Sequence, residues 1–230
     1  MYDVPVHIHK AVLMQRLLDG VTHGYVWYTA GAVPLSRAGR LAAKFAAHYG
    51  VDWNANRRAY AKRRGMANAR FYLLAQDGSS SLLWWLLATG GSGAIHDQER
   101  LYLVSDRRRR LRIEPDYELV RRTRPRHAGG GEVWTWRMTP ECYQAWRERI
   151  IQACRSKSPA AIRQALHSLY RVPGFSGIRH QAGNLVALAR REWRRRHGDT
   201  DLPGLRAKLP YLERIPDTTV RLSDLRGGVT

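Results

Sequence analysis

Apolar residues recur at helical spacing in the first fifty positions of the chain. Residues 7–18 are predicted to form a short helix, which Gly20 ends. A second helix is predicted over residues 36–49, because a proline and a serine favour its start and Gly50 favours its end. This second helix has an apolar stripe on one face and a basic stripe on another. The basic stripe consists of Arg37, Arg40, Lys44 and His48.

Strand patterns appear between and after these helices. Residues 25–29 are aromatic and β-branched, which is typical of a strand. Residues 70–76 and 82–89 predict a hairpin, because Asp77 and Gly78 form a turn signal between two apolar runs. The second of these runs is apolar on both faces, so it is expected to be a buried central strand, with a short buried helix as the alternative.

The second half of the chain first repeats the hairpin pattern and then becomes helical. Residues 117–123 and 132–138 predict a second hairpin around a glycine-rich loop. A strand is also predicted near the end, at residues 219–222. Three further helices are predicted over residues 139–155, 158–170 and 176–197.

This order of elements predicts an α+β fold. The expected arrangement is a ferredoxin-like or RNA-recognition-like sheet with an additional helical module. Residues 1–138 would form the nucleic-acid-binding α+β part with its basic loops, residues 139–198 a basic three-helix module, and residues 199–230 a tail that returns to the sheet.

The composition points to a polyanionic partner. The 230 residues include 39 basic and 19 acidic ones, which gives a net charge of +20, and only five of the basic residues are lysines. Arginine pairs with phosphate through two parallel hydrogen bonds and stacks on bases, so nucleic acid is the expected partner. No apolar run is long enough for a membrane span and no amphipathic anchor stands out, so no membrane partner is expected. The absence of a secretory signal and the two unpaired cysteines suit a cytoplasmic protein.

Motifs of metal and nucleotide chemistry are absent. The sequence has no Walker A loop, no GxGxxG after a strand, no HExxH and no zinc-spaced cysteines, so neither a metal nor a small-molecule cofactor is expected. His7 and His9 are interpreted as surface or capping histidines. Metal-independent RNA cleavage stays open, because RNA supplies its own 2′-hydroxyl nucleophile. The candidates for this chemistry in and beside one strand and its following helix are His23, Tyr28, Arg37, Arg40, Lys44 and His48, and the alternative is a solvated basic face that holds phosphates.

Three further arginine clusters are predicted to contact RNA phosphates. Arg57, Arg58, Arg63 and Arg64 alternate with Trp53 and Tyr60. Arg107, Arg108, Arg109, Arg110 and Arg112 form a dense run that is interpreted as a phosphate clamp, with a mobile solvated loop as the alternative. Arg190, Arg191, Arg194 and Arg195 lie near the end of the last long helix. The aromatic residues expected to stack on bases are Trp27, Tyr28, Trp53, Tyr60, Trp134 and Trp136.

Four segments together resemble the crRNA-processing endoribonucleases of type IV CRISPR systems, which are RAMP-type repeat-cleaving proteins. They are the aromatic strand at residues 25–28, the basic helix with Arg37, Arg40 and Lys44, the run 107–112, and the late segment 221–228. The resemblance covers most of the chain through size, arginine richness and element order. It implies recognition of a CRISPR repeat hairpin and one metal-independent cut, with a 5′-hydroxyl and a 2′,3′-cyclic phosphate as products.

The same resemblance implies that the enzyme stays bound to the crRNA and joins other effector subunits. It also points to arginines at the scissile phosphate, for which the candidates are Arg16, Arg37, Arg40 and Arg226. The main alternative is a non-enzymatic DNA-binding protein of a plasmid or other mobile element, acting in replication, partition or transfer control. In that case the segment 171–174 would be the turn of a helix-turn-helix. An RNA-associated structural protein is a third possibility.

Overall fold

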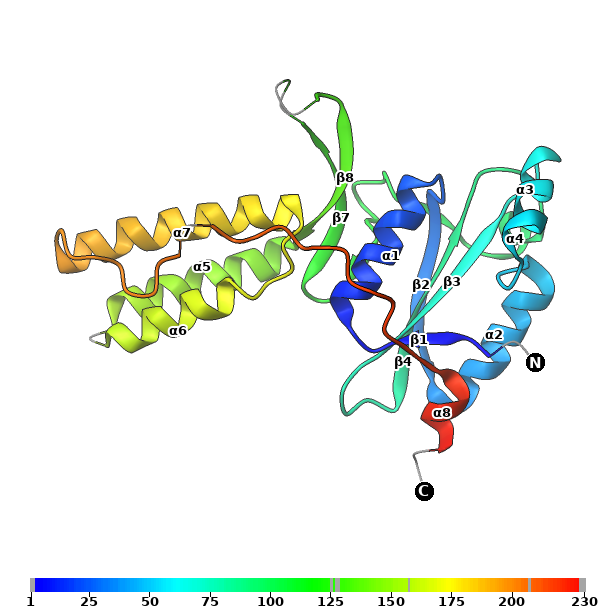
Figure 1. The fold of residues 1–230 in the computed structure, drawn as a ribbon, viewed down its shortest axis with the longest axis horizontal. Helices are drawn as coiled ribbons and strands as arrows, with labels where there is room; N and C mark the ends of the chain where they lie inside the picture. Colours follow the sequence, from blue (N-terminus) through cyan, green and yellow to red (C-terminus); the bar gives the residue numbers. More distant parts are fainter. Residues whose placement is uncertain (1–2, 125, 127–128, 157, 207, 228–230) are drawn as a thin grey trace. The chain divides into compact units, whose positions relative to one another are not determined.

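The computed structural model describes residues 3–124, 126, 129–156, 158–206 and 208–227. For residues 226 and 227 it describes the backbone alone. The α+β class is confirmed: the described part contains eight helices, a mixed six-stranded sheet and a three-stranded antiparallel sheet. The chain forms two compact units, shown in Figure 1. Unit 1 comprises residues 1–111 and 214–230, and unit 2 comprises residues 112–213.

The six-stranded sheet belongs to unit 1 and has the order β5–β2–β4–β3–β1–β9. Its strands are β1 (Pro5–His7), β2 (Trp27–Pro34), β3 (Ala69–Ala75), β4 (Ser81–Ala88), β5 (Tyr102–Leu103) and β9 (Thr219–Arg221). The pairing of β1 with β3 is parallel and every other pairing is antiparallel. A ferredoxin-like sheet is antiparallel throughout, so the observed sheet shares the α+β class with the expectation but has its own strand order.

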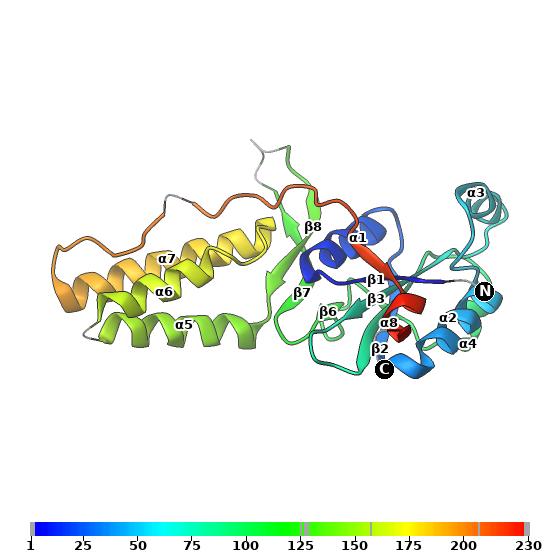
Figure 2. The same ribbon diagram turned by 60° about the horizontal axis from the view of Figure 1, so that its bottom comes forward.

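The predicted hairpin of β3 and β4 is confirmed, as is the central position of β4. Gly78 lies in the turn with a φ of 72°, a conformation that glycine adopts without strain. Leu82, Trp85, Leu86 and Leu87 are buried, because β4 lies between β3 and β2 and helices cover both faces of the sheet (Figure 2). A strand between two others in a covered sheet reads as a continuous apolar run, which explains its sequence.

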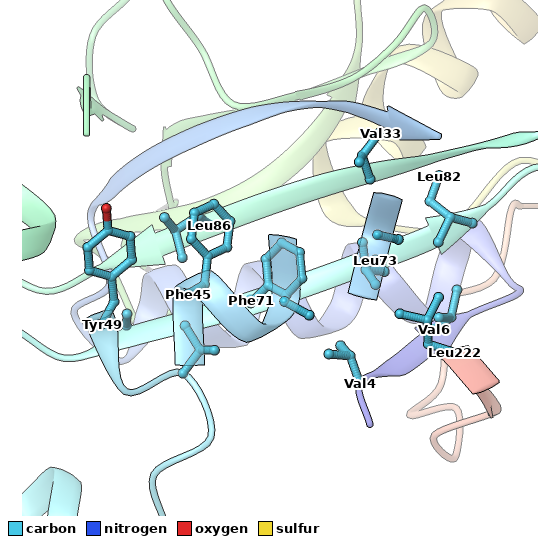
Figure 3. Packing of buried hydrophobic residues seen from close by; sticks show 14 of the residues in the cluster. Val4, Val6, Val33, Phe45, Tyr49, Phe71, Leu73, Leu82, Leu86 and Leu222 are labelled. Carbon is cyan, nitrogen blue, oxygen red and sulfur yellow. The ribbon is translucent and has the colours of Figure 1, made fainter. Parts of the chain in front are cut away.

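Helices cover both faces of this sheet. Helix α1 (Lys10–Thr22) lies on one face, while α2 (Leu35–Tyr49) and α8 (Leu222–Gly227) lie on the other (Figure 2). Phe45 of α2 packs against Phe71 of β3 at 5.1 Å between ring centroids, in the core shown in Figure 3. Helix α2 ends at Gly50, whose φ of 62° is the left-handed conformation of a helix C-cap.

Several elements of unit 1 differ from the predicted ones. Residues 5–7 form a strand, and the first helix spans Lys10–Thr22, so it begins after residue 7 and continues past Gly20. Residues 55–63, for which the sequence predicts no helix, form α3 (Ala55–Arg63), and the side chain of Asn54 caps this helix by accepting a hydrogen bond from the Arg57 amide. Only Ala61 is buried in α3, so the helix carries almost no apolar periodicity that sequence reasoning could detect. The short helix α4 (Ala94–Gln98) precedes β5, and neither α4 nor α8 has a counterpart among the predicted elements.

Unit 2 joins a small sheet to three helices. The sheet consists of β6 (Arg112–Ile113), β7 (Tyr117–Thr123) and β8 (Glu132–Met138), and the helices are α5 (Pro140–Arg155), α6 (Pro159–Leu169) and α7 (Ser176–His197). The hairpin packs on the start of α7, where the Thr135 hydroxyl accepts a hydrogen bond from the Gly177 amide at 3.1 Å. A Cβ on Gly177 would come within 2.4 Å of the Trp136 carbonyl, so this close approach requires glycine.

The three predicted helices and the second hairpin are therefore confirmed almost to the residue. The observed division of the chain, after residue 111, differs from the expected boundary at 138, because the hairpin packs with the helices. The segment after α7 runs along the helices of unit 2 before the chain re-enters unit 1 at Arg214. Within that segment, the Leu209 carbonyl accepts a hydrogen bond from Nε of Arg179 in α7 at 2.7 Å.

Candidate nucleic-acid interface

A groove between α5 and α7 gathers arginines from both helices of unit 2. It has a volume of about 530 Å³. Helices α5 and α7 are in contact and lie side by side in Figure 1. Helix α5 contributes Tyr143 and Arg147, which are one helical turn apart. The residues that α7 contributes are Asn184, Ala187, Leu188, Arg190, Arg191 and Arg194.

The groove carries positive charge with little to balance it. Four of its eight lining residues are arginines, and the lining within the described residues contains no carboxylate. Arg194 lies 3.6 Å from Asp199, but both side chains are more than three-quarters exposed, so water screens this pair. Arginines held this closely repel one another, and a polyanion in the groove would relieve that repulsion.

The local sequence explains why these side chains converge. Positions 184, 187, 191 and 194 of α7 are three or four residues apart and therefore share one face of the helix. The buried face of the same helix contains Leu185, Leu188 and Ala189. Sequence analysis found Arg190, Arg191 and Arg194 but missed Arg147, because its partners are thirty-seven or more positions away in the chain.

Two other predicted RNA contacts already have carboxylate partners. Arg195 does not line the groove and pairs with Glu192 at 3.0 Å on its own helix. Arg112 lies 3.3 Å from Glu118, a carboxylate that is almost fully buried, and 3.5 Å from Glu114. These two arginines stabilise unit 2 internally, which leaves less of their charge for a phosphate.

The basic stripe on α2 is confirmed as a solvent-facing surface of unit 1. Arg37, Arg40 and Lys44 are exposed, whereas the apolar stripe faces the sheet. Lys44 is the one of the three with an ion pair in the described structure, to Glu99 at 2.8 Å. Burial would raise the pKa of Glu99, but hydrogen bonds from Lys44 and Tyr49 outweigh it and hold the pKa below its usual value. Arg37 and Arg40 are therefore the more available cations of this surface.

Helix α3 presents its arginines in different states. Arg63 and Arg64 are exposed, and Arg57 lies over the ring of Trp53 at 4.5 Å. Arg58 is half-buried and donates from Nη2 to the Val51 carbonyl at 2.9 Å. Helix α3 therefore offers three exposed arginines and one that points back toward the body of unit 1.

The arginine run after β5 forms an organised turn. The Asp106 carboxylate accepts a hydrogen bond from the Arg108 amide at 2.8 Å. The hydroxyl of the buried Tyr28 donates a hydrogen bond to the Arg109 carbonyl at 3.1 Å. Arg109 also lies over the Tyr102 ring at 4.4 Å. Arg107 and Arg108 are exposed and Arg110 is half-buried. The backbone of this run is tied to β2 and β5, which favours a fixed surface over a mobile loop.

The candidate catalytic residues do not converge on one site. Arg16 lies on α1, on the opposite face of the sheet from Arg37 and Arg40, and its guanidinium contacts Asp217 and the Ile215 carbonyl. His23 is exposed at the end of α1, where its ring meets the Asp19 carbonyl at 2.7 Å. The Arg226 side chain lies outside the described residues. Arg37 and Arg40 are the members of this set that share one surface.

Tyr28 differs most from its expected role. Its side chain is buried and its hydroxyl donates to the Arg109 carbonyl, so it holds the arginine turn instead of facing a substrate. Trp136 is also fully buried and cannot stack on a base. Tyr60 is half-exposed and stays available for stacking. Trp27, Trp53 and Trp134 are partly buried.

The interpretation of His7 and His9 as surface or capping residues is correct for only one of them. His9 is exposed at the N-cap of α1. His7 lies on β1 and is 5 % exposed, and burial lowers its pKa. No group of three or more metal-ligating side chains occurs among the described residues.

The comparisons with protein-family models, curated proteins and solved structures give no match. Within the described part of the chain, every helix is too short or too polar to cross a membrane.

Proposed function

We propose that this protein binds structured RNA and holds it mainly through phosphate contacts. The α5–α7 groove carries the proposal: four arginines from two helices line one hollow that contains no carboxylate among its described residues. Guanidinium groups bind phosphate in a bidentate manner, and the adjacent Tyr143 and Asn184 are side chains that stack on or hydrogen-bond to nucleotides.

The exposed arginines of unit 1 extend the proposal to a second RNA-binding surface. Arg37 and Arg40 on α2, with Arg63 and Arg64 on α3, are solvent-facing. Phosphate contacts of this kind position RNA without reading its sequence. A-form RNA suits such a protein, because its deep major groove is approached through phosphates more than through base edges.

The resemblance to crRNA-processing endoribonucleases extends the proposal further, to cleavage of a repeat hairpin by its own 2′-hydroxyl. Arg37 and Arg40 are the residues proposed to stabilise charge on the scissile phosphate, since they are adjacent and exposed on α2. The proposed enzyme would keep the crRNA bound and present it to other effector subunits.

Binding is tested with a labelled RNA hairpin and a duplex DNA of equal length, titrated in EDTA at several salt concentrations. Arg147→Gln and Arg191→Gln are each expected to weaken hairpin binding about tenfold, because each removes a charge-assisted phosphate contact. Arg171→Gln is the matched control, since it removes the same charge from an exposed site outside the groove. Equal losses in all three variants, or a preference for duplex DNA, would contradict the proposal and favour the DNA-binding alternative.

Cleavage is tested on CRISPR repeat hairpins, again in EDTA, with a 2′-deoxy nucleotide at the cut position as the control. The expected result is a single cut that the deoxy nucleotide abolishes and that Arg37→Gln or Arg40→Gln slows at least a hundredfold. Tight binding without a cut would refute the nuclease function and leave the RNA-binding function intact.

A further inference from the structure

Unit 1 contains a second basic hollow, on residues that the proposed RNA surfaces mostly do not use. The pocket has a volume of about 370 Å³ and receives side chains from five separate segments. Its polar lining consists of His7 from β1, Arg16 from α1, Arg58 from α3, Arg70 and Tyr72 from β3, and Asp217 and Thr219 at the start of β9. It shares no residue with the α5–α7 groove.

The pocket has more positive than negative charge. Three arginines line it, against the single carboxylate of Asp217, which already contacts Nε of Arg16. Arg58 is held by the Val51 carbonyl, and Arg70 lies 4.6 Å from the ring of Tyr25. Neither of these interactions neutralises a guanidinium, so the lining side chains carry two more positive than negative charges. Asp19, outside the lining, lies 3.6 Å from Arg16 and offsets part of the charge of that arginine, which leaves Arg58 and Arg70 as the lining cations without a carboxylate contact among the described residues.

The same pocket collects polar atoms that lack a hydrogen-bond partner. Buried side-chain atoms without a hydrogen-bond partner among the described residues are Nδ1 of His7, Nη1 of Arg16, Nε of Arg58, Oδ1 of Asn68 and Nε of Arg70. Of these atoms, Nη1 of Arg16 does have an ion pair, with the Asp19 carboxylate at 3.6 Å. Four of these five belong to residues that line the pocket. Each unsatisfied buried polar group costs about 1–3 kcal/mol, and the three arginine nitrogens among these atoms are donors that call for a water, an ion or a ligand with acceptor oxygens.

We propose that this pocket is a binding site for a phosphate group. A tetrahedral oxyanion supplies the negative charge and the several acceptor oxygens that three guanidinium groups and an imidazole require. A single carboxylate would supply only two oxygens. The volume falls within the range of small-molecule sites, so the phosphate is accommodated together with an attached sugar or with water.

The phosphate site does not depend on the proposed RNA-binding groove, because the two share no residue. A phosphate in this pocket reaches the protein either as a free ion or as the terminal phosphate of a nucleotide or RNA strand. Both sources present the same chemistry to Arg58 and Arg70, so the experiment separates them by the probe.

The test records the arginine Nε–Hε signals of the full ¹⁵N-labelled protein during titration with sodium phosphate, with sodium chloride at equal ionic strength as the control. The expected result is saturable, phosphate-specific movement of the Arg58 and Arg70 signals, each assigned by its loss in an Arg→Gln variant. Movement with chloride alone, or no saturable change, would overturn the proposal. The wild-type signals decide the matter even if a variant is unstable.

Affinity measured by calorimetry provides a second readout. Arg58→Gln and Arg70→Gln are each expected to weaken phosphate binding about tenfold, whereas Arg171→Gln changes it less than twofold. Equal affinity in all three variants would refute the site. A short single-stranded RNA with a 5′-phosphate is then compared with its 5′-hydroxyl form to identify the source of the phosphate. Tighter binding of the phosphorylated strand indicates a strand end, and equal binding of the two strands indicates a free phosphate. Binding of the RNA hairpin to the groove is measured in a separate experiment, so the phosphate site and the RNA-binding groove can each be refuted without the other.

Discussion

His7 and His9 are two positions apart in the sequence but have different surroundings in the fold. His7 is buried beside Arg16 and Asp217, while His9 is exposed at the N-cap of α1. Burial lowers the pKa of His7, nearby Asp217 raises it less, and Arg16 lowers it further. His7 is therefore neutral in the fold at pH values where a histidine of the unfolded chain begins to take up a proton.

This difference predicts a pH-dependent contribution to stability. As the pH falls below about 6.5, the unfolded chain binds a proton that folded His7 refuses, so the free energy of unfolding decreases by at most about 1.4 kcal/mol per pH unit. His7→Gln is expected to flatten the profile between pH 7.5 and 5.5 relative to the unsubstituted protein. Urea denaturation in phosphate-free buffer measures both profiles. Identical profiles for His7→Gln and the unsubstituted protein would show that burial does not shift the pKa of His7.

At the scale of an element, strand β7 depends on one buried carboxylate. Glu118 accepts two hydrogen bonds from Arg137 of β8, at 2.6 and 2.8 Å, while Arg112 of β6 lies at 3.3 Å. The two arginines are equally exposed, so they form a matched pair on either side of one charge. The carboxylate ties the three strands of the small sheet together.

Replacing each arginine by methionine separates their contributions. Arg137→Met is expected to lower the free energy of unfolding of unit 2 by about 2 kcal/mol, because it removes two short charge-assisted bonds from a buried carboxylate. Arg112→Met is expected to cost under about 1 kcal/mol, as for a partly exposed ion pair. Thermal unfolding followed by circular dichroism compares them. A larger decrease in the free energy of unfolding for Arg112→Met than for Arg137→Met would show that Arg112 is the main partner of Glu118.

At the scale of the whole molecule, the positive charge is divided evenly between the two units. Residues 112–213 contain 20 basic and 10 acidic residues, and the rest of the chain contains 19 and 9, so each unit carries +10. Unit 2 is one continuous stretch of chain with its own buried residues, including Ile162, Leu166 and Leu185. Both properties suggest that it folds and binds polyanions without the rest of the chain.

We expect a protein comprising residues 112–213 to unfold cooperatively and to retain RNA hairpin binding. The four groove arginines predict that its log affinity falls with log salt concentration at a slope of about −3. The full chain is expected to have a steeper slope, because unit 1 adds phosphate contacts. Binding curves at several salt concentrations check both values. A shorter chain that folds but has lost all affinity would place the interface in unit 1.

Most regular elements could be predicted because their signals are local. Helices α2, α5, α6 and α7 bury one apolar stripe each, and the two hairpins have turn residues between apolar runs. Strand β1 has three residues, too few for a period to show, and α3 buries only Ala61. Those two elements are stabilised by their neighbours rather than by their own pattern.

The candidate interface could be predicted only in part. Charge and helical spacing located the exposed arginines of α2 and α7, and charge alone located those of α3, because both signals are visible in a single stretch of chain. The sequence could not distinguish Arg191, which lines the groove, from Arg195, which pairs with Glu192, since both lie in the same basic run. The sequence also suggested Tyr28 as a candidate site residue, but in the fold Tyr28 is buried and hydrogen-bonded to the arginine turn.

By itself, then, the sequence determined the α+β class, five of the eight helices that the structure describes, both hairpins, and the strongly positive charge of the chain. The tertiary structure decided the order of strands, the division after residue 111, and which arginines have carboxylate partners. It also brought His7, Arg16, Arg58 and Arg70 to one pocket from four elements. The physical reason is that periodicity and net charge are sums over neighbouring residues, whereas pairing and burial depend on contacts between segments far apart in the chain.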